Sequence, residues 1–172
     1  ATTVLQYEAT ECGAASLATI LRYHGRIVPL PQLRRECGVN RDGSNAQRVL
    51  LAAQSYGLQT KAFRCSGEQL VVQGSFPSIV FWGFNHFLVL EGFDQKYAYV
   101  SDPAEGRVRM LKAEFFDQFT GVVLEMTPGP EFKRGGRDAS PLWILPELLW
   151  PYRSQLLSLM LVASLLLVPN LL

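Results

Sequence analysis

Apolar residues in the first third of the chain recur at helical spacing. Three- and four-residue intervals separate Leu17, Ile20, Leu21 and His24. This spacing predicts a helix over residues 14–25, with Gly25 as its end. Two further helices are predicted over residues 32–36 and 46–56, on either side of a turn-forming stretch rich in Asn, Asp, Gly and Ser.

The middle of the chain changes to shorter runs that are rich in β-branched and aromatic residues. These runs predict strands over residues 59–64, 77–82, 86–93, 96–102, 106–111 and 122–126. A helical turn over residues 68–72 and a helix over residues 112–119 interrupt them. Because helices come first and an antiparallel sheet follows, the pattern predicts an α+β domain over residues 1–126.

The last part of the chain has a different composition. Residues 127–141 are rich in proline, glycine and basic side chains, which predicts a linker. Aromatic residues in 142–154 precede an uncharged apolar run over 155–172, so we expect a membrane-interface helix and then the start of a transmembrane helix. Positive charge ahead of the run places that side in the cytosol. The alternative is a buried helix of a soluble protein.

Charge and cysteine content narrow the class of protein. Charged residues make up 18% of the 172 residues and the net charge is +1, which argues against a nucleic-acid binder held by a broad basic field. The three cysteines, Cys12, Cys37 and Cys65, form no Cys-x-x-Cys pair. A zinc site and a disulfide framework are therefore not expected, and free thiols suit a reducing compartment.

Cys12 lies at or just before the start of the first predicted helix. The unpaired N–H groups and the positive end of the helix dipole favour a thiolate there, and the thiolate is the nucleophilic form of cysteine. Cys12 is thus a candidate nucleophile. The alternative is a buried, inert cysteine that acts as a small hydrophobic residue.

The predicted hairpin over residues 86–102 brings two further groups together. If its turn is centred on Asp94, Leu88 faces Val100 and His86 faces Asp102 at the open end. A carboxylate on an apolar face needs a partner, and His86 is the obvious one. A one-residue slip of the turn would weaken this pairing, and a purely structural His–Asp bond is the alternative reading.

A cysteine, a histidine and an orienting carboxylate can perform nucleophilic catalysis. Asp102 would hold the His86 ring, His86 would take the proton of Cys12, and the thiolate would attack a carbonyl. The side-chain amide of Gln6 and the backbone N–H of Cys12 are candidate donors to the resulting oxyanion.

The remaining candidates have simpler interpretations. We expect His24 to be a packed residue at a helix end, and Cys37 and Cys65 to be buried thiols. Glu8 and Glu11 flank the candidate nucleophile and are expected to be solvated surface charges.

Three motifs in this order, Gln6…Glu11-Cys12-Gly13-Ala-Ala-Ser-Leu, Asn85-His86-Phe-Leu-Val-Leu and Asp102-Pro103-Ala-x-Gly106, resemble the papain-like peptidase domain of bacteriocin-exporting ABC transporters. The resemblance covers roughly residues 1–126. It implies a papain-like fold with Cys12 as nucleophile, His86 as base, Asp102 as orienting acid and Gln6 as oxyanion donor. The residue before the nucleophile is often Asp in the family and is Glu11 here.

The resemblance also implies a cellular role. It implies cleavage of precursor peptides after a double-glycine motif in their leaders, followed by export through a homodimeric transporter in the bacterial inner membrane. The peptidase domain would lie in the cytosol and need no cofactor or metal, whereas ATP and magnesium would bind a nucleotide-binding domain outside these residues. A non-cleaving substrate-binding module and a thiol acyltransferase are the alternatives; no signature for an acyl-donor site is visible.

Overall fold

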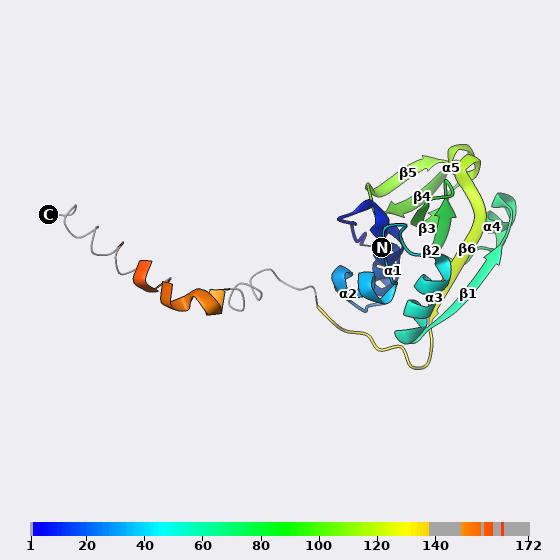
Figure 1. The fold of residues 1–172 in the computed structure, drawn as a ribbon. Helices are drawn as coiled ribbons and strands as arrows, with labels where there is room; N and C mark the ends of the chain where they lie inside the picture. Colours follow the sequence, from blue (N-terminus) through cyan, green and yellow to red (C-terminus); the bar gives the residue numbers. More distant parts are fainter. Residues whose placement is uncertain (1, 138–148, 156, 160–162, 164–172) are drawn as a thin grey trace. The chain divides into compact units, whose positions relative to one another are not determined.

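A computed structural model of the chain describes residues 2–137, 149–155, 157–159 and 163. It divides the chain into two compact units, Ala1–Arg137 and Asp138–Leu172. The elements of the first unit (Figure 1) are η1 (Ala9–Glu11), α1 (Cys12–Tyr23), α2 (Leu30–Glu36), α3 (Ala46–Ser55), β1 (Leu58–Arg64), α4 (Gly67–Gln73), β2 (Ser78–Trp82), β3 (His86–Phe93), β4 (Tyr97–Asp102), β5 (Gly106–Leu111), α5 (Lys112–Gln118) and β6 (Phe119–Pro128). Every helix and strand predicted between residues 14 and 126 is present, with small shifts of its ends.

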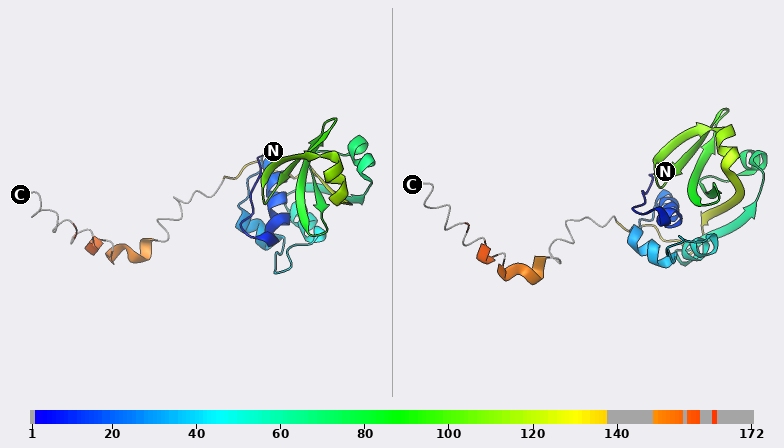
Figure 2. Two further views of the ribbon diagram at one scale, coloured as in Figure 1. Left: turned by 90° about the horizontal axis from the view of Figure 1, so that it is seen from above. Right: turned by 45° about the horizontal axis from the view of Figure 1, so that its top comes forward.

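The strands of the first unit form one antiparallel sheet in the order β1-β6-β2-β3-β4-β5. The sheet curves around α1, and α2 and α3 lie beside this helix (Figure 2). The prediction of an α+β domain, with a helical N-terminal half packed on an antiparallel sheet, is confirmed.

The alternation of side chains along the strands creates an apolar core on each face of the sheet. Phe87 and Val89 of β3 pack in the cluster that contains residues of α1, α2 and α3. Leu88 and Leu90 pack in the second cluster, with residues of α4 and α5. The even-numbered apolar run that was predicted for the hairpin therefore faces α4 and α5.

Helix α1 is the central element of the domain, since every residue from Cys12 to Leu21 is buried. Small side chains such as Ala14, Ala15 and Ala18 allow neighbouring elements to approach closely. The N-terminal segment covers a further side of the helix, where the Val4 N–H donates a hydrogen bond of 3.0 Å to Thr19 Oγ1. The first residue of α1 is consequently fixed by packing from several directions.

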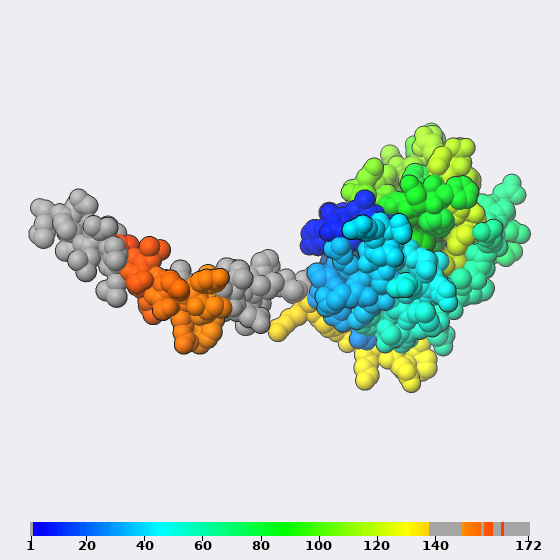
Figure 3. Space-filling model, viewed as in Figure 1, coloured from blue at the N-terminus to red at the C-terminus, as the bar shows by residue number. Residues whose placement is uncertain are grey.

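The segment predicted to begin a linker at residue 127 belongs to the first unit as far as Arg137. Strand β6 continues to Pro128, and the Gly129 N–H donates to the Gly57 carbonyl at 3.0 Å. Further on, the Ile27 N–H donates to the Gly135 carbonyl at 2.8 Å. The segment runs along the outside of the helical half (Figure 3, yellow). The prolines and glycines of residues 127–137 therefore belong to a segment that packs on the first unit, whereas a free linker was predicted.

Most of the residues for which membrane contact was predicted lie outside the described residues. Within 149–155, 157–159 and 163 the structure has a short 3₁₀ helix, η2 (Trp150–Tyr152). Among the described residues, none of the helices has the length and apolar character needed to cross a membrane. The rest of the linker, the interface helix and the transmembrane start stay predictions.

Candidate active site

The hairpin that carries His86 and Asp102 has a different register from the predicted one. Leu90 pairs with Val100, whereas the prediction paired Leu90 with Ala98. The turn lies later in the chain, and a bulge at Glu91 shifts the ladder between Leu90 and Gly92. The predicted pairing was therefore wrong by two residues up to Leu90 and by three beyond the bulge, where Phe93 pairs with Ala98. A two-residue shift keeps the same side chains on the same face, so Leu88, Leu90, Ala98 and Val100 share one face as predicted. Beyond the bulge the faces of β3 exchange, and Phe93 joins the same cluster.

His86 and Asp102 still meet at the open end of the hairpin. In this register they are diagonal neighbours rather than direct partners, a distance that long side chains span. His86 Nε2 lies 2.8 Å from Asp102 Oδ1. The Ala104 N–H donates to the same Oδ1 at 2.7 Å. Burial raises the pKa of Asp102, but the hydrogen bonds from His86 and the Ala104 amide outweigh burial and hold this pKa below 3.8.

Cys12 is the first residue of α1, as the helix-start prediction requires, and it is 6% exposed. Burial of the thiol raises the pKa of Cys12, but hydrogen bonds from the His86 ring and the Phe87 backbone amide bring this pKa below its usual 9.0. The Gly13 amide at the helix start acts in the same direction. Cys12 is therefore biased toward the nucleophilic thiolate.

The imidazole of His86 favours its protonated form, which complements the thiolate of Cys12. Its hydrogen bond to Asp102, and then its hydrogen bond to Cys12, raise the pKa of His86 to about 9, against the opposing effect of burial. Because Nε2 contacts Asp102, Nδ1 is the ring nitrogen left for the thiol. The three side chains thus form a line, Cys12–His86–Asp102, that stabilises a thiolate–imidazolium pair.

Gln6 reaches the site through its backbone. Its N–H donates to the Pro103 carbonyl at 2.9 Å, directly after Asp102. Within the described residues, the side-chain Oε1 of Gln6 is buried and has no hydrogen-bond partner. Oε1 is an acceptor, so its lack of a partner does not by itself support the donor role predicted for the Gln6 side chain.

A cavity of about 620 Å³ opens beside Cys12. Its walls come from the loop before α3, from β1 and β2, and from the turn between β2 and β3: Arg41, Asp42, Gly43, Ser44, Asn45, Ala46, Arg64, Phe81, Phe84 and Asn85 line it, with Ala9, Thr10, Phe87 and Val122. It lies between the helical half and the sheet, so an extended peptide could pass the Cys12 sulfur.

The sequence alone did not single out Phe84. This aromatic residue is 81% exposed and has a positive φ of 61°, which is strained for a bulky side chain. Strained residues tend to occur at functional sites. Its only sequence signal is its position, two residues before His86.

The residues with simpler interpretations mostly behave as predicted. His24 Nε2 lies 3.2 Å from the Met126 carbonyl oxygen, and the ring packs edge-on against Phe132. Burial raises the pKa of Cys37 to about 12 and also raises that of Cys65, so neither thiol is activated. Cys37 is buried as predicted, whereas Cys65 is only partly buried. Glu11 also differs from the prediction: we expected a solvated charge, but it is 1% exposed. A salt bridge from Arg34 and backbone N–H donors allow its burial.

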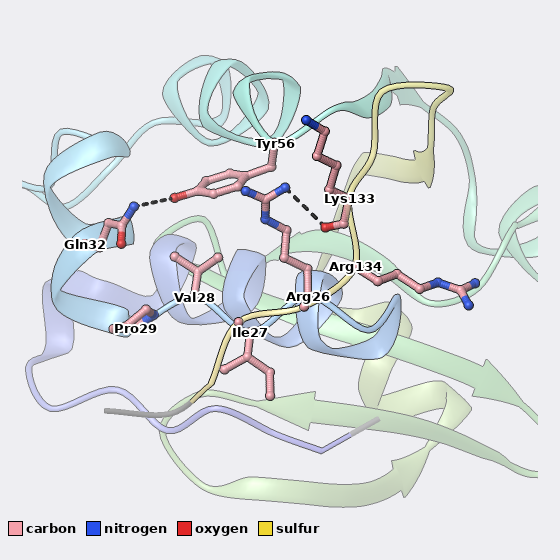
Figure 4. A pocket seen from close by; sticks show the side chains of 10 residues that line it. Arg26, Ile27, Val28, Pro29, Gln32, Tyr56, Lys133 and Arg134 are labelled. Atoms are coloured by element: carbon pink, nitrogen blue, oxygen red, sulfur yellow. Dashed lines mark hydrogen bonds between the residues drawn. The ribbon is translucent and has the colours of Figure 1, made fainter. Parts of the chain in front are cut away.

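A second hollow, of about 230 Å³, lies away from Cys12 between α2, the end of α3 and the segment that contains Lys133 (Figure 4). Arg26 lines this hollow. Its guanidinium lies 4.6 Å from the centre of the Tyr56 ring and donates a hydrogen bond of 3.2 Å to the Lys133 carbonyl. Arg134 points away from the hollow (Figure 4). These contacts hold the segment after β6 in place.

A helix-start thiol hydrogen-bonded to a histidine that a carboxylate orients is the arrangement of a cysteine peptidase. The model of the peptidase C39 family matches residues 1–131. Since this is most of the chain, the chain belongs to the peptidase C39 family, a family of cysteine peptidases.

Two curated relatives from Escherichia coli are similar to the same region. The probable microcin-H47 secretion/processing ATP-binding protein is 35% identical over 127 residues, and the colicin V secretion/processing ATP-binding protein is 34% identical over 128 residues. Each match covers 74% of this chain but only 18% of the relative. The chain thus spans a small part of the length of these proteins.

Solved structures agree with the family. A double glycine motif protease from an AMS/PCAT transporter, crystallised with the leader peptide, is 53% identical with a TM-score of 0.72, covering 73% of this chain and 90% of that one. The peptidase domain of Streptococcus ComA has a TM-score of 0.70 at 24% identity, covering 74% and 98%, and supports the fold alone.

Proposed function

We propose that this domain is a cysteine endopeptidase that removes leader peptides after a double-glycine motif from bacteriocin-type precursors. The observation that carries the proposal is the Cys12–His86–Asp102 line beside an open cavity. Similarity to the double glycine motif protease with its leader peptide supports this choice of substrate.

The roles of the residues follow from their contacts. The Cys12 thiolate attacks the carbonyl carbon of the second glycine, and the carbonyl electrons move to the oxygen. Gln6 and the Cys12 N–H donate hydrogen bonds to this oxyanion. His86, held by Asp102, gives its proton to the leaving amine, and then activates a water that hydrolyses the thioester.

The proposal extends to the rest of the protein through the relatives. By analogy with the secretion/processing ATP-binding proteins, this domain would belong to a homodimeric ABC exporter in the bacterial inner membrane, with the peptidase in the cytosol. ATP and magnesium would then bind outside these residues. A module that binds the leader without cleaving it is the second candidate, and the activated Cys12 argues against it.

The test is cleavage of a synthetic leader peptide that continues past Gly-Gly, with mass spectrometry to locate the cut. The wild-type chain should cut after the second glycine, and Cys12→Ala should abolish cleavage because no other activated thiol is present in the described residues. Cys65→Ala is the matched control and should cleave normally. If both wild type and Cys12→Ala bind the peptide and neither cuts it, the domain is a binding module.

A further inference from the structure

The buried carboxylate of Glu11 connects the two segments on either side of the candidate nucleophile. Its Oε2 accepts hydrogen bonds from the backbone N–H groups of Tyr7, at 2.8 Å, and Glu8, at 3.0 Å. Its Oε1 lies 3.0 Å from Nη1 of Arg34 on α2. A buried carboxylate requires such partners, and here each partner fixes the backbone next to Cys12.

Arg34 holds the same turn from outside the site. Its guanidinium donates to both carboxylate oxygens of Glu8, from Nη1 at 3.2 Å and from Nη2 at 2.7 Å, in addition to its contact with Glu11. The planar guanidinium suits this forked geometry, which a lysine could not reproduce. The turn over residues 7–11 is thereby fixed to α2.

Gln6 directly precedes this turn. Its N–H is bonded to the Pro103 carbonyl, and the next residue is bonded to Glu11. Resting on the function proposed above, we propose that the Glu11–Arg34 ion pair positions the oxyanion hole: it holds the Gln6 amide and the Cys12 N–H in a fixed relation without contacting substrate. Glu11 and Arg34 are thus both positioning residues.

This role has a kinetic signature that simple stabilisation of the fold lacks. The oxyanion exists only during the reaction, so misplaced donors lower kcat and leave KM nearly unchanged. The groups that lower the pKa of Cys12 are His86 and the backbone amides of Phe87 and Gly13. Neither Glu11 nor Arg34 is among them, so the reactivity of the thiol should survive their replacement.

The experiment compares Arg34→Gln and Glu11→Gln with Arg35→Gln in the full 172-residue chain. Arg35 is the next residue on α2, is exposed, and makes no ion pair or side-chain hydrogen bond with Glu8 or Glu11 among the described residues, so Arg35→Gln removes the same charge as Arg34→Gln without removing these contacts. We expect Arg34→Gln and Glu11→Gln to lower kcat by about 10- to 100-fold, less than complete loss of a donor. KM and the alkylation rate of Cys12 by iodoacetamide should stay within about twofold, and Arg35→Gln should match wild type.

A leader peptide ending in glycinal gives a second readout that does not need turnover. The Cys12 sulfur adds to the aldehyde carbon, the thiol proton passes to the aldehyde oxygen, and this oxygen occupies the oxyanion hole. Arg34→Gln should bind the aldehyde about tenfold more weakly, with unchanged affinity for the matching glycinol peptide, which has no carbonyl to attack.

Several results would overturn the inference. The first is a kcat that stays unchanged in both Arg34→Gln and Glu11→Gln. The second is that Arg34→Gln weakens binding of the aldehyde and of the glycinol equally. The third is that the alkylation rate of Cys12 falls in parallel with kcat. Failure of the proposed function would give a different result. The wild-type chain itself would then leave the leader uncut and would bind the aldehyde no more tightly than the glycinol. That result would also remove the basis of the inference.

Discussion

At the scale of single residues, the reactivity of Cys12 depends on neighbours from three parts of the chain. The helix start supplies the Gly13 amide, β3 supplies His86 and the Phe87 amide, and β4 supplies Asp102 through His86. Burial opposes ionisation of the thiol. The hydrogen bonds outweigh it because each favours the thiolate–imidazolium form over the neutral pair.

The opposite pKa shifts of Cys12 and His86 predict a bell-shaped pH profile for cleavage. As pH rises, kcat/KM should increase when Cys12 ionises, below the ordinary thiol pKa of 9.0. It should decrease again near pH 9, where His86 loses its proton. Leader cleavage measured from about pH 5 to pH 10 checks both limbs.

Asp102→Asn should move the upper limb of that profile to lower pH. The hydrogen bond to Asp102 is the largest cause of the raised His86 pKa, so its loss lowers this pKa. We expect kcat to fall by roughly 10²- to 10⁴-fold, because the neutral amide neither stabilises the imidazolium nor fixes the same tautomer. An upper limb that stays near pH 9 in Asp102→Asn would contradict this account.

At the scale of elements, the start of α1 packs tightly against the loop that precedes α3. A Cβ at Gly13 would lie 2.4 Å from Ser44 Oγ and 3.1 Å from Val49 Cγ2. Gly13→Ala should therefore destabilise the domain by about 1–3 kcal/mol through overpacking, measured by thermal unfolding. The Ser44 hydroxyl, buried and without a hydrogen-bond partner among the described residues, is the main obstacle.

A double-mutant cycle separates this contact from other effects. Ser44→Ala removes the obstructing oxygen and breaks no hydrogen bond among the described residues, so it should change the stability little by itself. The Gly13→Ala/Ser44→Ala chain should recover most of the stability lost in Gly13→Ala, with a coupling of about 1 kcal/mol or more. Strict additivity would show that the clash lies elsewhere.

The turn between β2 and β3 presents Phe84 to the cavity at the cost of backbone strain. Phe84→Gly should raise KM for the leader peptide by roughly 3- to 10-fold, because an apolar contact is lost. It should not lower the melting temperature, since glycine adopts a positive φ freely. Val72→Ala, at another exposed apolar residue on α4, is the control and should leave KM unchanged.

At the scale of the whole molecule, the first unit is completed by residues that follow its last strand. Phe132 packs against the main core cluster, and Gly129 and Gly135 bond to the loops that follow α3 and α1. The domain therefore extends to Arg137.

A chain shortened to end at Met126 should be less stable than one that ends at Arg137, by about 2–4 kcal/mol from lost burial and hydrogen bonds. Phe132→Ala in the longer chain should lose an intermediate amount. Thermal or urea unfolding of the three chains measures this. Equal stability of the two shortened chains would show that the docked segment contributes nothing.

The sequence by itself determined the elements of the first unit and indicated which residues form its candidate site. Periodicity and turn residues are local signals, so the helix that begins near Cys12 and the hairpin of His86 and Asp102 could be predicted. The motifs around these residues resemble those of the peptidase family whose model matches residues 1–131.

Tertiary structure decided the rest, because it depends on contacts between residues distant in the chain. The bulge at Glu91 set the hairpin register, and Arg34 allowed the burial of Glu11. Cavity walls such as Phe84 came together from separate elements. Local periodicity carries no information about these contacts, since the energy of each depends on which surfaces meet after the sheet and the helices have packed.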